Sequence, residues 1–180
     1  MQTLEHPDER AAGLYWLAFL ITGNTESSIE VAVEALESQS EATPFFADWI
    51  ATWSRKVVIA KALAAIRGEL CASLLRTAAK RAAAPMQPLW KWTRGRSMTK
   101  VQLERALLAI DVFPRCALLL SVFEKMSLED AAILLDGDLK LVRKAQMIGL
   151  RELTYNLSRV QSWTSGAGNC SVLTSEMQHA

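Results

Sequence analysis

Residues with the chemistry for catalysis are few in this sequence and poorly spaced for it. The two histidines, His6 and His179, lie near opposite ends of the 180 residues. The three cysteines, Cys71, Cys116 and Cys170, lie far apart, without the spacing of a zinc site or a disulfide framework. The sequence contains neither a Gly-x-Ser-x-Gly motif nor a phosphate-binding glycine loop. We therefore expect no enzyme, no metal site, no cofactor and no small-molecule substrate.

Cations form the pattern with the clearest chemical meaning. Between Arg55 and Arg105, twelve lysines and arginines face only Glu69 and Glu104, whereas the 54 residues before this stretch contain nine acids and one cation, Arg10. A dense run of positive charge can bind the phosphates of a nucleic acid. It can equally form a solvated surface, and charge alone does not decide between the two.

A second group of cations lies in the pattern of a helix-turn-helix. Ser127 followed by Asp130 is typical of a helix start, and Asp136-Gly137 is typical of a tight turn. Asp138 is placed to cap a longer helix, expected to reach about Leu157. In this motif the second helix lies in the major groove of DNA.

The packing expected for this motif leaves cations on its outer face. Ala132, Leu135 and Val142 would hold the two helices together. The outward side chains that we predict to contact DNA are Lys140, Arg143, Lys144 and Met147. Cations at the front of such a helix suit phosphates, and arginine also suits guanine edges. Any helical hairpin in a bundle has the same periodicity, so a purely structural role stays open.

The remaining pattern predicts an all-α fold, because apolar residues recur at helical spacing and glycine and proline are sparse. Pro85, Pro88 and Gly95 interrupt the helices within a basic, Trp-containing stretch. We predict two small helical domains, at residues 8–81 and 99–160. A basic linker at 82–98 would join them, and a disordered tail would follow at 161–180.

The apolar run at 14–21 is shorter than the roughly 20 residues of a membrane span, and acids precede it where a secretory signal has cations. We expect a cytoplasmic protein without a membrane segment.

Within the first domain, helices are expected at 8–22, from a cap at Thr25 or Ser27, and from about 45 to 67 or beyond. The second of these would turn Ile29, Val33 and Leu36 inward and display an acidic face. In the third, the spacing of Trp49 and Trp53 favours packing in the core over stacking on bases.

The segment 130–153 resembles, without gaps, the region-four domain of sigma-70-type transcription initiation factors, especially the extracytoplasmic-function class. The family pattern E-I-A-x-x-L-G-x-S-x-x-T-V-K aligns with D-A-A-I-L-L-D-G-D-L-K-L-V-R at 130–143, and 106–110 with 113–115 resembles its A-L-x-x-L-P-x-x-x-R lead-in. A second resemblance lies in the first half. Residues 17–24 are similar to the first core helix and its L-T-G-D ending, and Trp49, Arg55 and Ile59 match a W-x-x-x-x-x-R-N-x-x-I helix.

The resemblance implies a factor that binds core RNA polymerase and directs it to promoters. Glu30 and Glu34 lie where the family's D-x-V-Q-E-x-F motif grips the polymerase clamp. Arg55, Lys56 and Lys61 would contact the minus-ten element, and the second domain would contact the minus-thirty-five element. The loop at 38–43 lies where family members capture a flipped base, although a plain surface loop fits equally well. The resemblance also implies regulation by an anti-sigma factor.

The sequence departs from the family at several of these positions. Val33 and Leu36 replace the glutamine and the aromatic residue of the clamp motif, and Ile148 and Leu150 replace arginines of the recognition helix. Each lost phosphate contact would weaken binding to DNA. The alternative is therefore a sigma-like regulator or decoy that binds polymerase or DNA without promoting initiation. A DNA-binding regulator that never meets polymerase is a third hypothesis, which leaves the first half unexplained.

Overall fold

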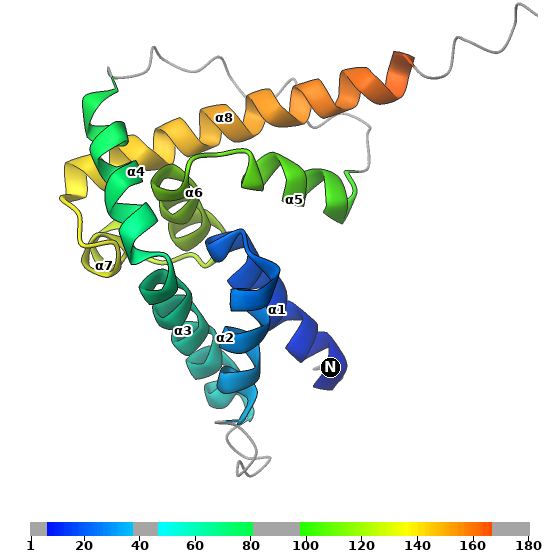
Figure 1. Cartoon of the computed structure of the whole chain (residues 1–180), viewed down its shortest axis with the longest axis vertical. Helices are drawn as coiled ribbons and strands as arrows, with labels where there is room; N and C mark the ends of the chain where they lie inside the picture. Colours follow the sequence, from blue (N-terminus) through cyan, green and yellow to red (C-terminus); the bar gives the residue numbers. More distant parts are fainter. Residues whose placement is uncertain (1–6, 38–46, 81–97, 167–180) are drawn as a thin grey trace, which may run out of the picture.

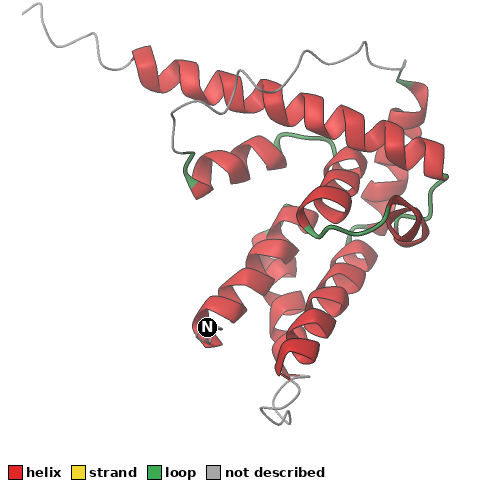
Figure 2. Cartoon of the chain, turned by 180° about the vertical axis from the view of Figure 1, so that it is seen from behind, coloured by secondary structure: helices red, strands yellow, loops and turns green. Residues whose placement is uncertain are grey.

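The computed structural model describes residues 7–37, 47–80 and 98–166, and every regular element in these ranges is a helix (Figures 1 and 2). The all-α prediction is confirmed. None of the described helices is both long and apolar enough to cross a membrane. The elements follow in the order α1 (Pro7–Thr22), α2 (Thr25–Glu37), α3 (Ala47–Ala65), α4 (Arg67–Ala79), α5 (Lys100–Leu108), α6 (Val112–Leu118), the π-helical turn η3 (Leu119–Phe123), α7 (Leu128–Leu134) and α8 (Leu139–Gly166).

Local sequence signals account for most of the helix ends. The spacing of Thr99 and Gln102 in the sequence predicts a capping box. The Thr99 hydroxyl accepts a hydrogen bond from the Gln102 backbone N–H, and the Gln102 side chain accepts one in return, so α5 begins with this capping box. At α2 the prediction was wrong, because Asn24 provides the cap: its Oδ1 accepts a bond from the Ser27 N–H at 3.1 Å. Gly23, with a φ of +70°, provides the left-handed residue after α1.

Two helix boundaries differ from the sequence prediction. The expected helix from about 45 is interrupted at Ile66, whose φ of −103° and ψ of 14° are not helical, and the chain resumes as α4. The helix α8 continues to Gly166, past its expected end near Leu157, so the first residues of the predicted disordered tail are helical. Extending an existing helix costs far less than nucleating one, which explains how polar residues join it. Residues 167–180 lie outside the described residues.

The helices form two groups that meet along α4 and α6. The first group is α1, α2 and α3, each in contact with the other two. In the second, α6 packs against α8, and α5 and α7 also lie against α8. The helix α4 contacts α3 of the first group and α6 and α8 of the second, so it joins the groups, as Figures 1 and 2 show from opposite sides.

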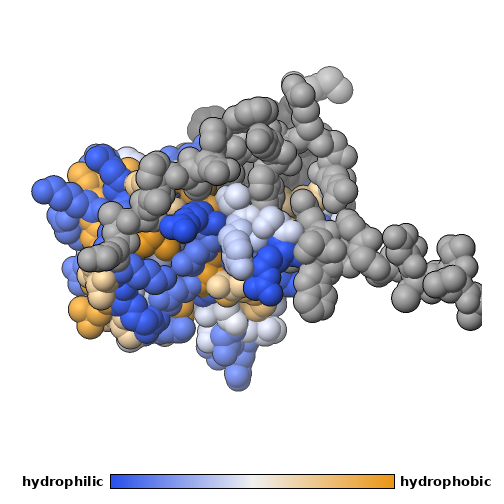
Figure 3. Space-filling model, turned by 90° about the horizontal axis from the view of Figure 1, so that it is seen from above, coloured by the Kyte–Doolittle hydropathy of each residue, from blue (hydrophilic) through white to orange (hydrophobic). Residues whose placement is uncertain are grey.

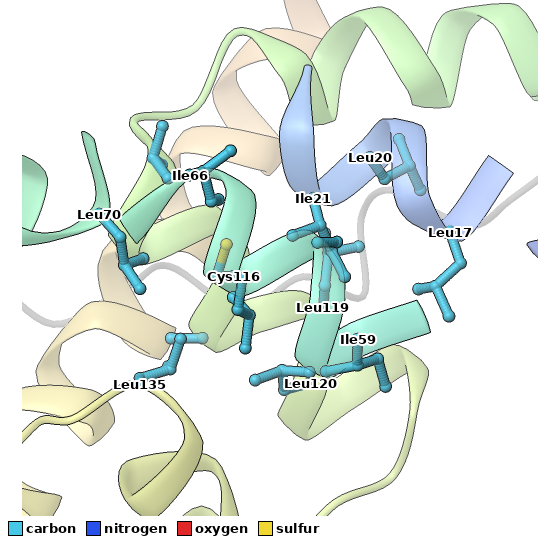
Figure 4. Packing of buried hydrophobic residues seen from close by; sticks show 14 of the residues in the cluster. Leu17, Leu20, Ile21, Ile59, Ile66, Leu70, Cys116, Leu119, Leu120 and Leu135 are labelled. Carbon is cyan, nitrogen blue, oxygen red and sulfur yellow. The ribbon is translucent and has the colours of Figure 1, made fainter. Parts of the chain in front are cut away.

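The buried apolar residues of the two groups form one cluster (Figure 4). Leu17 and Ile21 of α1 and Ile59 of α3 belong to it together with Leu119 of η3 and Leu135 after α7. Two separate domains would each enclose a core, whereas here the cores are continuous. The predicted two-domain arrangement is therefore not confirmed, and its linker at 82–98 lies almost wholly outside the described residues.

A buried arginine lies at the junction of the groups. Arg115 Nη2 donates to the Ile21 carbonyl at 3.3 Å, and Nη1 donates to the carbonyls of Leu108 and Ile110, each at 3.2 Å. These carbonyls belong to the ends of α1 and α5, where a helix lacks internal donors. The guanidinium thus satisfies acceptors of both groups at once.

The crossing of α8 over α6 depends on Gly149. A Cβ atom there would lie 2.7 Å from the Pro114 carbonyl oxygen and 3.1 Å from the Leu118 Cβ. Both neighbours belong to α6, so α8 lies against α6 at a separation that no larger residue permits.

We predict that Gly149→Ala lowers the free energy of unfolding by about 1–3 kcal/mol, because the added methyl group overpacks this crossing. Gly13→Ala is the matched control, since nothing lies within 4 Å of its added Cβ in α1. That change should instead stabilise the helix by about 0.5–1 kcal/mol. Urea unfolding of both variants tests this, and equal stability of the two would contradict the described crossing.

Candidate nucleic-acid interface

The segment from α7 to α8 has the local geometry of a helix-turn-helix. The Ser127 hydroxyl accepts a bond from the Asp130 N–H at 3.0 Å, which caps α7. The Asp138 carboxylate accepts one from the Lys140 N–H at 3.1 Å at the start of α8. Between them Asp136 has a φ of +50°, and the Gly137 N–H donates to the Ala132 carbonyl at 3.0 Å. The predicted caps and turn are confirmed.

The two helices are held together as the sequence predicted. Ala132, Leu135 and Val142 are all buried, and the last two are almost completely inaccessible. A Cβ atom on Gly137 would lie 3.3 Å from Phe113 and 3.4 Å from Val142, so the turn is packed closely over the core. This packing fixes which face of α8 remains outside.

Three of the four predicted contacts on α8 are exposed. Lys140 and Arg143 lie on the surface, and the side chain of Met147 is half exposed. Lys144 does not point freely outward, because its Nζ donates to the Ala78 carbonyl at 3.0 Å, at the end of α4. Figure 3 shows hydrophilic residues over much of the described surface seen from above, with smaller apolar areas between them.

Two of the three DNA contacts predicted on α3 form ion pairs with glutamates. Arg55 Nε donates to Glu124 Oε2 at 2.9 Å, and its second nitrogen pairs with the other carboxylate oxygen. Lys61 pairs with Glu34, so a predicted DNA contact and a predicted polymerase contact neutralise each other. Lys56 is exposed.

Acids after residue 100 pair with several cations of the described part of the basic stretch. Besides Arg55, three of its cations form ion pairs with them among the described residues: Arg67 with Asp136 at 3.8 Å, Arg76 with Asp111 at 2.7 Å, and Lys80 with Glu152 at 3.2 Å. The partners are 35 to 72 residues apart, so no local sequence pattern predicts these pairs. Sequence reasoning assigned Glu124 no role, and it too pairs across this interface. The basic stretch is therefore in part an internal interface.

The helix α2 presents an outer face that is apolar as well as acidic. Glu30 and Glu34 are exposed, as expected. The prediction that Ile29 and Val33 point inward is wrong, since they are 50% and 47% exposed. The buried stripe consists instead of small residues and one valine, namely Ser28, Val31, Ala32 and Ala35. Small side chains let α2 lie close to its neighbours, which turns the larger aliphatic residues outward.

The prediction that Trp49 and Trp53 lie in the core is also wrong. They are 65% and 41% exposed, and their rings stack on each other with centroids 6.4 Å apart. The buried residues of α3 are Ser54, Val58, Ile59, Ala62 and Leu63, a stripe on another face of the helix. An aromatic pair at helical spacing is thus left on the surface. The loop at 38–43 lies outside the described residues.

The buried thiol of Cys116 and an apolar cavity are the remaining candidates for a reactive group or a ligand site among the described residues. Burial raises the pKa of the Cys116 thiol to about 12, so this thiol stays protonated at neutral pH. A cavity of about 390 Å³ lies between α4 and α7, with Cys71 and Leu74 on one wall and Ile133 and Leu134 on the other. Its lining is mostly apolar, and its two charged residues, Arg67 and Asp136, pair with each other.

Comparisons with protein-family models, with curated proteins and with solved structures find no match to this chain. The resemblance to sigma factors stays a prediction from the sequence.

The ion pair between Asp111 and Arg76 gives folding an expected acid dependence. The hydrogen bond from Arg76 lowers the pKa of Asp111 to about 2, well below the value of about 3.9 for an unfolded chain. A carboxyl group with a depressed pKa stabilises the fold above its unfolded pKa, and this contribution is lost as the pH falls through the folded value. We predict that Asp111→Asn flattens the fall in unfolding free energy between about pH 4 and pH 2. Urea unfolding across this range measures it, and an unchanged slope would contradict the ion pair.

Proposed function

We propose that this chain is a sigma-like transcription initiation factor, which binds core RNA polymerase and directs it to promoters through the minus-ten and minus-thirty-five elements. The observation that carries the proposal is the helix-turn-helix of α7 and α8, with Lys140, Arg143 and Met147 on its exposed face. The resemblance of both halves of the sequence to the family, in the family order, supports the same assignment.

The second helix of this motif would lie in the major groove of the minus-thirty-five element. Lys140 and Arg143 occur in its first two turns, the part that reaches base edges in this docking mode. Arg143 is suited to guanine and Lys140 to phosphate. Met147, one turn beyond Arg143, offers an apolar contact.

The exposed face of α3 would contact the minus-ten element. Trp49 and Trp53 offer a stacked aromatic surface, and Lys56 lies one turn beyond Trp53. Aromatic side chains beside cations bind unpaired bases by stacking, with little dependence on sequence. This combination would suit a strand exposed during promoter opening.

The outer face of α2 would bind the polymerase. Glu30 provides negative charge, Glu34 shares its charge with Lys61, and the exposed Ile29 and Val33 lie beside them. Protein interfaces combine an apolar centre with charges that select a partner. The complement of this face is a surface with both cationic and aliphatic side chains.

A sigma-like regulator or decoy is the second candidate, and a specific observation favours it. Arg55, Lys61 and Lys144 are predicted DNA contacts, yet each is engaged within the chain. A protein with fewer available contacts would hold polymerase without opening promoters. This candidate predicts polymerase binding without transcripts.

We predict that Arg143→Glu weakens binding to a mixed-sequence DNA duplex by about tenfold or more at low salt, because it replaces a phosphate or base contact by a repulsive charge. Arg105→Glu is the matched control, since it makes the same charge change at an exposed position on α5. Fluorescence anisotropy measures both affinities. Equal losses would show that binding depends on net charge alone, and would contradict a specific role for α8.

A further inference from the structure

A predicted DNA contact of each half of the chain is engaged by the other half. Arg55 of α3 forms two bonds to Glu124, which follows η3. Lys144 of α8 donates to the Ala78 carbonyl at the end of α4. Both contacts join the segment before residue 81 to the segment after it. In the first the cation meets a carboxylate, and in the second it meets a backbone carbonyl oxygen.

Glu124 presents to Arg55 the geometry that a phosphate would use. Its two oxygens meet two nitrogens of the guanidinium, the paired arrangement in which arginine binds carboxylates and phosphates alike. The Glu124 side chain is only 11% exposed, whereas the Arg55 side chain is 45% exposed. Glu124 is therefore fixed by its surroundings, and the guanidinium remains reachable from solvent.

The second contact lies in a comparable setting. The end of α4 concentrates unpaired carbonyls and the negative end of the helix dipole, which favours a cation such as Lys144. The ion pair between Lys80 and Glu152 holds the same end of α4 against α8. The end of α4 that binds Lys144 is thus itself held against α8.

We propose that Glu124 is an internal competitor for phosphate at Arg55, so that DNA contacts this guanidinium only after displacing the carboxylate from it. The contact is autoinhibitory: it lowers affinity for any polyanion while leaving the arginine in place. This inference rests on the proposed DNA-binding function. It requires only an exchange of side-chain partners, with no separation of the two groups of helices.

The test compares Glu124→Gln with Glu129→Gln on a fluorescein-labelled duplex of mixed sequence at low salt. Both variants remove one negative charge from the same part of the chain, and Glu129 is an exposed residue of α7. An exposed ion pair contributes up to about 1 kcal/mol, so Glu124→Gln should bind up to about fivefold more tightly than Glu129→Gln. Glu124→Asp keeps the charge but shortens the side chain, and it too should bind more tightly than the wild type.

The Arg55→Gln variant completes a double-mutant cycle for Arg55 and Glu124. If Glu124 acts through this guanidinium, the double variant Arg55→Gln, Glu124→Gln should bind no better than Arg55→Gln after correction for the charge effect seen in Glu129→Gln. Equal affinities of Glu124→Gln and Glu129→Gln, with DNA still bound, would overturn the competitor and leave the proposed function standing. Absence of DNA binding in every variant would overturn both.

Discussion

The arrangement of this chain depends on one buried guanidinium. Arg115 is almost fully buried, and its three hydrogen bonds go to backbone carbonyls at the end of α1, at the end of α5 and just after α5, with no carboxylate among them. Desolvation lowers its pKa, but arginine keeps its charge in proteins. A charge buried this way is costly unless its acceptors are in place. The two groups of helices are therefore held at the orientation in which the carbonyl of Ile21 reaches this side chain.

Ion pairs between the two halves of the chain also hold the two groups of helices together. Four ion pairs among the described residues join a cation at 55–80 to an acid after residue 110. The same cations made the sequence look like a binding surface for a polyanion. In the proposed function, each bond from these cations to nucleic acid would compete with an internal partner. The fold and the proposed function thus depend on the same set of charges.

Local signals in the sequence were sufficient for the all-α fold, for the capping box at Thr99 and for the turn at Asp136, because each depends on residues within a few positions. Signals that depend on distant partners were not. The spacing of Trp49 and Trp53 predicts an apolar stripe equally well whichever side faces the core, and the true stripe lies on another face. Arg115 could be noted only as part of a motif, and Glu124 had no signal at all, since its partner is 69 residues away. The predicted DNA contacts on α8 lie on its surface apart from Lys144, whose partner also lies on a distant helix.

The most direct measurement is run-off transcription with purified protein, bacterial core RNA polymerase and fragments of the genome that encodes the chain. We predict that the protein co-purifies with the polymerase and yields discrete transcripts absent with core enzyme alone. Polymerase binding without transcripts would favour the regulator or decoy over an initiation factor. Neither binding nor transcripts would contradict the assignment to transcription initiation.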